Sequence, residues 1–206
     1  MLTILAQPLD SFRYRDYRVL WVAGLCISSS YWLQQIVIGW LMFDTTGSAV
    51  LTSIALGLDT LPFLFLGPVG GVVADRWNRR YTIAVSAAYM ALVTLGLAVI
   101  VLSGIVQSWH IMAYALLIGL SFPLIDPAWM SLLTGTVPKK SIVNAIALNG
   151  LAENGSRFLF PPVGGLVIAL FGPGQALVAG AALYAASSAA SLTITRYEFE
   201  LKAVVR

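Results

Sequence analysis

The sequence predicts an all-α membrane protein with six transmembrane helices, and three observations support this fold class. Of the 206 residues, 59% are hydrophobic and only 10% are charged, whereas about 25% of a soluble globular chain is charged. Six apolar segments follow one another along the chain, separated by short polar turns. Nearly all lysines and arginines lie in those turns or at the chain ends. With so few charges, most of the surface needs the bilayer as its solvent.

The turns define the six segments. They contain Gly, Pro or charged residues and lie at residues 44–48, 75–80, 103–104, 135–140 and 172–174. The helices are therefore expected at residues 19–43, 50–74, 81–102, 110–133, 142–171 and 176–195. Each is long enough to cross a hydrocarbon core of about 30 Å as an α-helix. Because the turns are short, consecutive helices are expected to be antiparallel neighbours.

The basic residues predict the orientation. Except for Arg157, which lies inside the fifth segment, they occupy the chain ends and the turns after the second and fourth segments: Arg13, Arg15, Arg18, Arg76, Arg79, Arg80, Lys139, Lys140, Arg196, Lys202 and Arg206. Six crossings place all of these on one side of the membrane. The positive-inside rule then predicts a multi-pass protein of the plasma (inner) membrane with both termini cytoplasmic. Residues 1–18 form a lead and residues 196–206 a tail.

Several other classes are not expected. The single cysteine, Cys26, excludes an internal disulfide, and the single histidine argues against a metal cluster. No metal or cofactor is therefore predicted. The basic residues do not alternate with aromatic residues over an extended stretch, so nucleic acid is not an expected partner. No G-x-S-x-G motif or paired nucleophile and base indicates an enzyme.

A basic block follows the second segment with the spacing G-x-x-x-D-R-x-x-R-R. Gly71 leaves room for close approach of helix backbones. Asp75 lies at the membrane boundary, where a carboxylate can meet a helix N-terminus or an arginine. Arg76, Arg79 and Arg80 are expected to hold the loop in the cytoplasm, near lipid phosphates. The alternative is that the block is only a charged turn that obeys the positive-inside rule.

Ionisable residues inside the predicted helices are candidates for a substrate or proton pathway, because they are costly in hydrocarbon. Asp59 lies about 22 Å from the basic end of the second helix at about 1.5 Å per residue. It has no basic partner in its helix and is expected to face a water-filled cavity. Asp126 lies in the fourth helix, and Glu153 and Arg157 share one face of the fifth. Asp126 and Arg157 have similar depths, so a structural ion-pair cluster is the alternative.

Uncharged residues add two expectations. Gln34, Gln35 and Asn149 lie within predicted helices and are candidates for lining the cavity. The pair Pro161-Pro162 is expected to bend the fifth helix, because proline removes a backbone hydrogen bond. Gly164-Gly165 follows and leaves this helix without side chains at that point.

The basic block resembles motif A of the major facilitator superfamily, which lies between the second and third helices of these transporters. Residues 40–49 are similar to the W-L-x-x-x-L-T-G-S-x run of its enterobactin-exporter-like and macrolide-efflux-like branch. Pro127-Ala128-Trp129 with Val137-Pro138 is similar to the P-A-W-Q…V-P stretch of that branch, and residues 144–165 resemble its fifth helix, in which Phe160 replaces the first Gly of G-P-x-x-G-G. In motif A, Asn78 replaces Gly, and Asn is the residue that next best tolerates positive φ.

The resemblance covers about residues 12–195 and implies half of a twelve-helix secondary transporter. Motif A then acts as a latch during alternating access. The expected activity is proton-coupled efflux of a small amphipathic molecule such as a drug or siderophore, with Asp59 the first candidate for proton coupling and Asp126 the second. Expected partners are the lipid bilayer, the substrate and a second six-helix half, from the same polypeptide, a separate chain or a second copy. A non-transporting membrane scaffold or degenerate half is the alternative.

Overall fold

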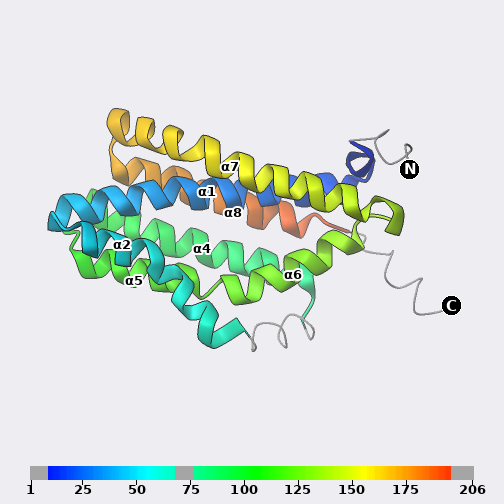
Figure 1. The fold of residues 1–206 in the computed structure, drawn as a ribbon, viewed down its shortest axis with the longest axis horizontal. Helices are drawn as coiled ribbons and strands as arrows, with labels where there is room; N and C mark the ends of the chain where they lie inside the picture. The colour runs from blue at the N-terminus through cyan, green and yellow to red at the C-terminus, as the bar shows by residue number, and fades with distance from the viewer. Residues whose placement is uncertain (1–8, 68–76, 196–206) are drawn as a thin grey trace.

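The chain folds as a bundle of long helices that run along one common axis (Figure 1). The computed structural model describes residues 9–67 and 77–195, and within these ranges it contains helices and no strand. The elements are η2 (Asp10–Arg13), α1 (Arg15–Thr46), α2 (Ala49–Gly57), η3 (Leu58–Thr60), α4 (Arg79–Leu102), α5 (Ser108–Gly119), α6 (Phe122–Gly135), η4 (Lys139–Ser141), α7 (Ile142–Phe171) and α8 (Pro173–Leu192). Residues 61–67 continue as helix after η3.

Four stretches of helix in the described residues are long and apolar enough to cross a membrane. They are Ala49–Gly67, Arg79–Leu102, Ser108–Gly135 and Pro173–Leu192. α1 and α7 have 32 and 30 residues and lie alongside these spans (Figure 1), but they are not among the four. The chain is therefore an all-α, multi-pass membrane protein, and the crossing of the bilayer by α1 and α7 stays a prediction.

Two of the helices that were predicted to be continuous are interrupted near mid-length. The second changes to a 3-10 turn at η3, and the fourth ends as α5 at Gly119 and restarts as α6 at Phe122. A proline lies two residues after each interruption: Pro62 cannot supply the α-helical donor for the carbonyl of Leu58, and Pro123 cannot supply it for that of Gly119. α7, in contrast, runs without interruption through Pro161 and Pro162.

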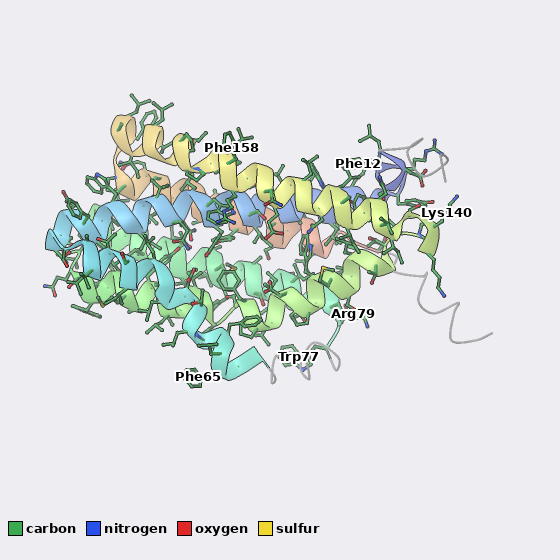
Figure 2. All side chains as sticks on the ribbon, viewed as in Figure 1. Phe12, Phe65, Trp77, Arg79, Lys140 and Phe158 are labelled. Carbon is green, nitrogen blue, oxygen red and sulfur yellow. The ribbon has the colours of Figure 1, made fainter. Side chains whose placement is uncertain are left out.

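The core lies where α8 packs between α1 and α4. Val37, Met90 and Tyr184, one from each of these helices, are fully buried there. The Ser30 hydroxyl donates to the carbonyl of Gly180 at 2.8 Å, which shows how closely α1 and α8 approach. Large apolar side chains cover the outside of the bundle, as on a protein solvated by lipid; Phe158 on α7 and Phe65 in the helix after η3 point outward (Figure 2).

The beginning of α1 is tied to the beginning of α7 at one end of the bundle. The Ser11 hydroxyl donates to Asn144 Oδ1 at 2.8 Å, and the Ser141 hydroxyl donates to Asp10 Oδ2 at 2.7 Å. The Tyr17 hydroxyl donates to the carbonyl of Ala145 at 3.0 Å. The part of the expected lead that the structure describes is thus folded against α7, and α1 begins at Arg15 rather than at residue 19.

Candidate functional site

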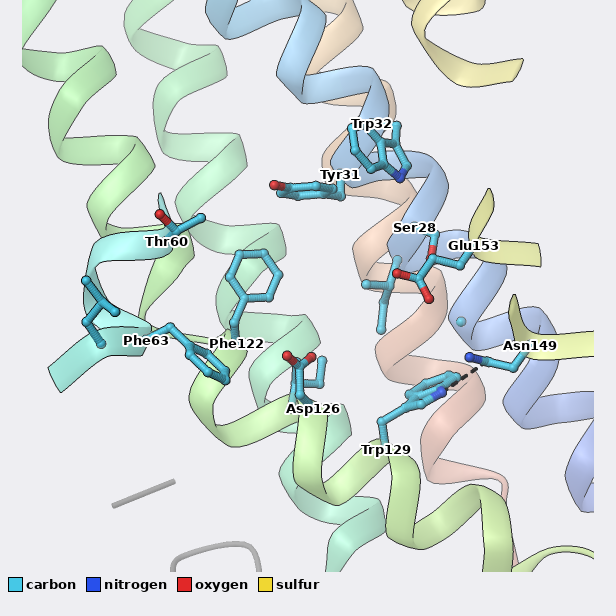
Figure 3. A pocket seen from close by; sticks show the side chains of 14 residues that line it. Ser28, Tyr31, Trp32, Thr60, Phe63, Phe122, Asp126, Trp129, Asn149 and Glu153 are labelled. Atoms are coloured by element: carbon cyan, nitrogen blue, oxygen red, sulfur yellow. Dashed lines mark hydrogen bonds between the residues drawn. The ribbon is translucent and has the colours of Figure 1, made fainter. Parts of the chain in front are cut away.

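A cavity of about 520 Å³ lies between α1, the helix after η3, α6 and α7. This volume is in the range of sites for drug-sized molecules. Its wall is largely aromatic and aliphatic, with a few polar groups (Figure 3). The lining residues are Gly24, Ile27, Ser28, Tyr31, Trp32, Thr60, Phe63, Leu64, Phe122, Ile125, Asp126, Trp129, Asn149 and Glu153.

Helical periodicity places these side chains. On α1 the lining positions repeat every three or four residues from Gly24 to Tyr31, and on α6 they do so from Phe122 to Trp129. On α7 the two lining positions, Asn149 and Glu153, are four apart. Each of these helices therefore presents one face to the cavity.

Trp129 joins three of the helices at one end of the cavity (Figure 3). Its indole Nε1 donates to Asn149 Oδ1 at 3.1 Å, which links α6 to α7. The ring also lies directly over Gly24 on α1, where a Cβ atom would be 2.4 Å from a ring carbon. The glycine thus makes room for the indole. Asn149 lines the cavity and also holds Trp129 in place.

Two carboxylates, Asp126 on α6 and Glu153 on α7, face the same cavity (Figure 3). The alternative of an ion pair between Asp126 and Arg157 is not seen in the structure, which describes both residues. The guanidinium of Arg157 instead lies over the ring of Trp32, 5.0 Å from its centroid, a favourable cation–π arrangement. Within residues 9–67 and 77–195, no Lys, Arg or His lines the cavity.

Asp59 is buried behind the cavity wall, not exposed to it. Only 4% of the residue is accessible. Its Oδ2 accepts hydrogen bonds from the Tyr31 hydroxyl at 2.8 Å and from Gln35 Nε2 at 3.0 Å. The void beside it is about 10 Å³, which holds at most about one water. The expectation that Asp59 faces a water-filled cavity is therefore wrong, because Tyr31 separates it from the large cavity.

Gln34 lies in a polar network inside the bundle, away from the large cavity. Its Nε2 donates to Ser30 Oγ at 3.0 Å and to Thr94 Oγ1 at 3.1 Å, and its Oε1 accepts from the Tyr114 hydroxyl. These contacts connect α1 to α4 and α5. The side chain is 2% exposed, so the structure gives Gln34 a packing role. Gln35 contacts Asp59 instead of the cavity.

The basic block is described only from Trp77 onward, and Gly71, Asp75 and Arg76 lie outside the described residues. Asn78 caps α4: its Oδ1 accepts from the backbone N–H of Arg80 at 3.2 Å, and its φ is −65°. The tolerance of Asn for positive φ is therefore not used at this position. The Arg80 Nη1 donates to the carbonyl of Ile194 at 2.6 Å, which joins the beginning of α4 to the chain just after α8. Arg79 is the first residue of α4.

The Pro-Gly region of α7 lies against α1. A Cβ atom at Gly164 would be 3.4 Å from the carbonyl oxygen of Leu33, whereas one at Gly165 would meet nothing within 4 Å. Gly164 is therefore the residue that permits close approach. Phe160 packs against the main apolar core, so the bulky replacement for glycine is accommodated.

Comparison with known proteins identifies the family. The family described as "Transmembrane secretion effector", which is part of the major facilitator superfamily, matches residues 6–205. The chain belongs to this family. It is 28% identical over 131 residues to the uncharacterized MFS-type transporter YfiS of Bacillus subtilis, covering 63% of this chain and 30% of the relative. It is 25% identical over 154 residues to the staphyloferrin A transporter of Staphylococcus aureus, covering 74% of this chain and 39% of the relative.

Membership of this family confirms that the chain is a major facilitator superfamily protein, as the basic block indicated. It points to transport rather than to enzymatic catalysis. The matched segments span well under half the length of both relatives.

Proposed function

We propose that this chain is one six-helix half of a secondary active transporter that exports a small amphipathic molecule in exchange for protons. The observation behind the proposal is the cavity of about 520 Å³, whose aromatic wall contains two carboxylates within a member of a transporter family. An aromatic wall suits an apolar body, and intramembrane carboxylates are typical of proton pathways.

Vesicle flux tests the proposal. The chain is expressed together with its second half in inside-out vesicles with an acidic lumen, and three amphipathic dyes of different charge are followed: ethidium, anilinonaphthalene sulfonate and Nile red. Transport predicts uptake of at least one dye that collapses when the pH gradient is removed. If none moves although the protein is folded and inserted, the scaffold alternative is favoured.

Exposed polar side chains on α7 support a second six-helix half as the partner of this chain. Glu153, Asn154 and Arg157 are exposed on α7, and such groups avoid contact with lipid. Covering them with a second half, around the same cavity, removes this cost. The shortness of the chain relative to its relatives is consistent with such a partner.

Six crossings with cytoplasmic termini make a labelling prediction. In a Cys26→Ala background, a cysteine at Asp44 or Ile105 should react with an impermeant maleimide from outside, and one at Trp77 or Lys140 should not. These four residues are exposed. Gly47 and Gly104 are avoided because their φ values are positive. Reaction of the Lys140 cysteine in sealed cells would contradict the topology.

Motif A makes a second prediction. If Asp75 is part of a conformational latch, Asp75→Asn should impair flux while membrane insertion is retained, and should shift the balance of inward- and outward-open states by about 1–3 kcal/mol. Accessibility of a cysteine at Asn149, in the cavity wall, reports that balance. Equal losses of insertion and flux would instead favour the simple charged turn.

For proton coupling, the geometry favours Asp126 and Glu153 over Asp59. Both face the cavity, whereas Asp59 is enclosed by Tyr31 and Gln35. Two negative charges in one apolar cavity repel each other, and a proton bound by either carboxylate relieves that repulsion. Entry of a substrate and loss of a proton can therefore be linked at this pair.

A further inference from the structure

We propose that the cavity selects lipophilic organic cations and rejects anionic ligands, polycarboxylates included. This inference rests on the proposed function, because it names the substrate class of the same cavity. Three features of the wall support it: its charged groups, its aromatic rings and the direction of its hydrogen-bond donors.

Among the lining residues that the structure describes, the two charged groups are both acidic. Asp126 and Glu153 project into the cavity from α6 and α7 (Figure 3). Neither forms an ion pair in the described part of the chain, so both are available to a ligand. The basic residue nearest along α7, Arg157, is stacked on Trp32 and is not among the lining residues. A bound cation gains two opposite charges in a low-dielectric site, whereas an anion meets two like charges.

The aromatic residues supply the second feature. Tyr31, Trp32, Phe63, Phe122 and Trp129 line the cavity from three different helical segments. The faces of such rings attract cations, most strongly where water is excluded. They also provide apolar surface for organic substituents. A small hydrated metal ion would gain little from this wall, so the fit is to a bulky onium ion.

The third feature is that three hydrogen-bond donors of the wall are already used within the protein. Trp129 Nε1 donates to Asn149 at 3.1 Å, and the Tyr31 hydroxyl donates to Asp59 at 2.8 Å. The Thr60 hydroxyl donates to the carbonyl of Gly57 at 2.7 Å. An anion entering the cavity would lose hydration without regaining these hydrogen bonds.

A ligand rich in carboxylates would place further negative charge beside Asp126 and Glu153.

Tetraphenylphosphonium and tetraphenylborate test the proposal, because they have nearly the same shape and opposite charge. Binding of each to the purified 206-residue chain in neutral detergent is measured by equilibrium dialysis. The difference between the wild type and the double variant Asp126→Asn/Glu153→Gln isolates binding at the carboxylates from partition into detergent. Asp44→Asn, which removes one exposed charge outside the cavity, is the matched control. Circular dichroism checks that each variant keeps its helix content.

The expected result is that the double variant binds the phosphonium about tenfold or more weakly, as for loss of a desolvated ionic contact. It should bind the borate no more weakly than the wild type, and Asp44→Asn should match the wild type for both ions. Equal phosphonium binding by the wild type and the double variant would overturn the proposal, as would wild-type binding of the borate that the double substitution weakens. Gradient-driven movement of the anionic dye in the vesicle assay would then still support transport, so the two proposals fail separately.

Discussion

Asp126→Asn should reduce proton-driven efflux to the level of protein-free vesicles while substrate exchange continues. Asparagine keeps the size of the side chain but cannot bind and release a proton. The coupling of efflux to protons is therefore lost, whereas the substrate path through the cavity is retained. The measurement uses the assembled transporter in vesicles: efflux driven by a pH gradient is compared with exchange of labelled against unlabelled dye at equal pH. Exchange reports the intact cavity and efflux reports the coupling.

Asp59→Asn is the matched comparison. Asp59 accepts hydrogen bonds from Tyr31 and Gln35, and asparagine retains an acceptor oxygen for them. We therefore expect Asp59→Asn to keep proton-driven efflux and to lower the free energy of unfolding by about 1 kcal/mol. If Asp59→Asn abolishes the driven flux and Asp126→Asn retains it, the assignment to Asp126 is wrong, and the buried carboxylate is the coupling group.

The sequence predicts the helices well where hydrophobicity and turns coincide. α7 has the bounds that the turns indicate, residues 142–171, and α4 begins two residues before the expected start. The interruptions at η3 and between α5 and α6 were missed because hydropathy alone does not register a break in backbone hydrogen bonding. Pro62 and Pro123 were the available signals. They are ambiguous alone, since Pro161 and Pro162 leave α7 continuous.

The sequence indicated charged residues of the candidate site but not the aromatic residues that line it. The cost of ionisable groups in hydrocarbon singles out Asp59, Asp126, Glu153 and Arg157 from the sequence. Asp126 and Glu153 line the cavity, whereas Asp59 and Arg157 do not. Tyr31, Trp32 and Trp129 lie in helices whose apolar residues are spread over several faces, so no periodicity tells which ring faces a cavity and which faces lipid. The sequence could not show whether Asp126 and Arg157 form an ion pair, for a similar reason. Depth along a helix can be counted, but rotation about its axis cannot.

The two helix interruptions meet in space, which makes Gly119 the residue most sensitive to added volume. Gly119 is the last residue of α5 and is buried. A Cβ atom there would lie 2.2 Å from the carbonyl oxygen of Asp59 and 2.9 Å from its Cα. These are backbone atoms, so they cannot turn aside as the end of a side chain can. The 3-10 turn at η3 approaches α5 this closely only because Gly119 has no side chain.

Gly119→Ala should therefore destabilise the chain by about 1–3 kcal/mol, the usual cost of overpacking. It should also impair flux, because moving η3 displaces Asp59 from Tyr31, whose ring lines the cavity. Gly96→Ala is the control: this glycine lies within α4, where a Cβ atom meets nothing within 4 Å, and alanine favours a helix interior over glycine. Thermal unfolding of both variants in the same detergent gives the comparison. Equal stability of the two variants would mean that η3 and α5 are not in this close contact, and the position of Asp59 behind Tyr31 would then lose its structural basis.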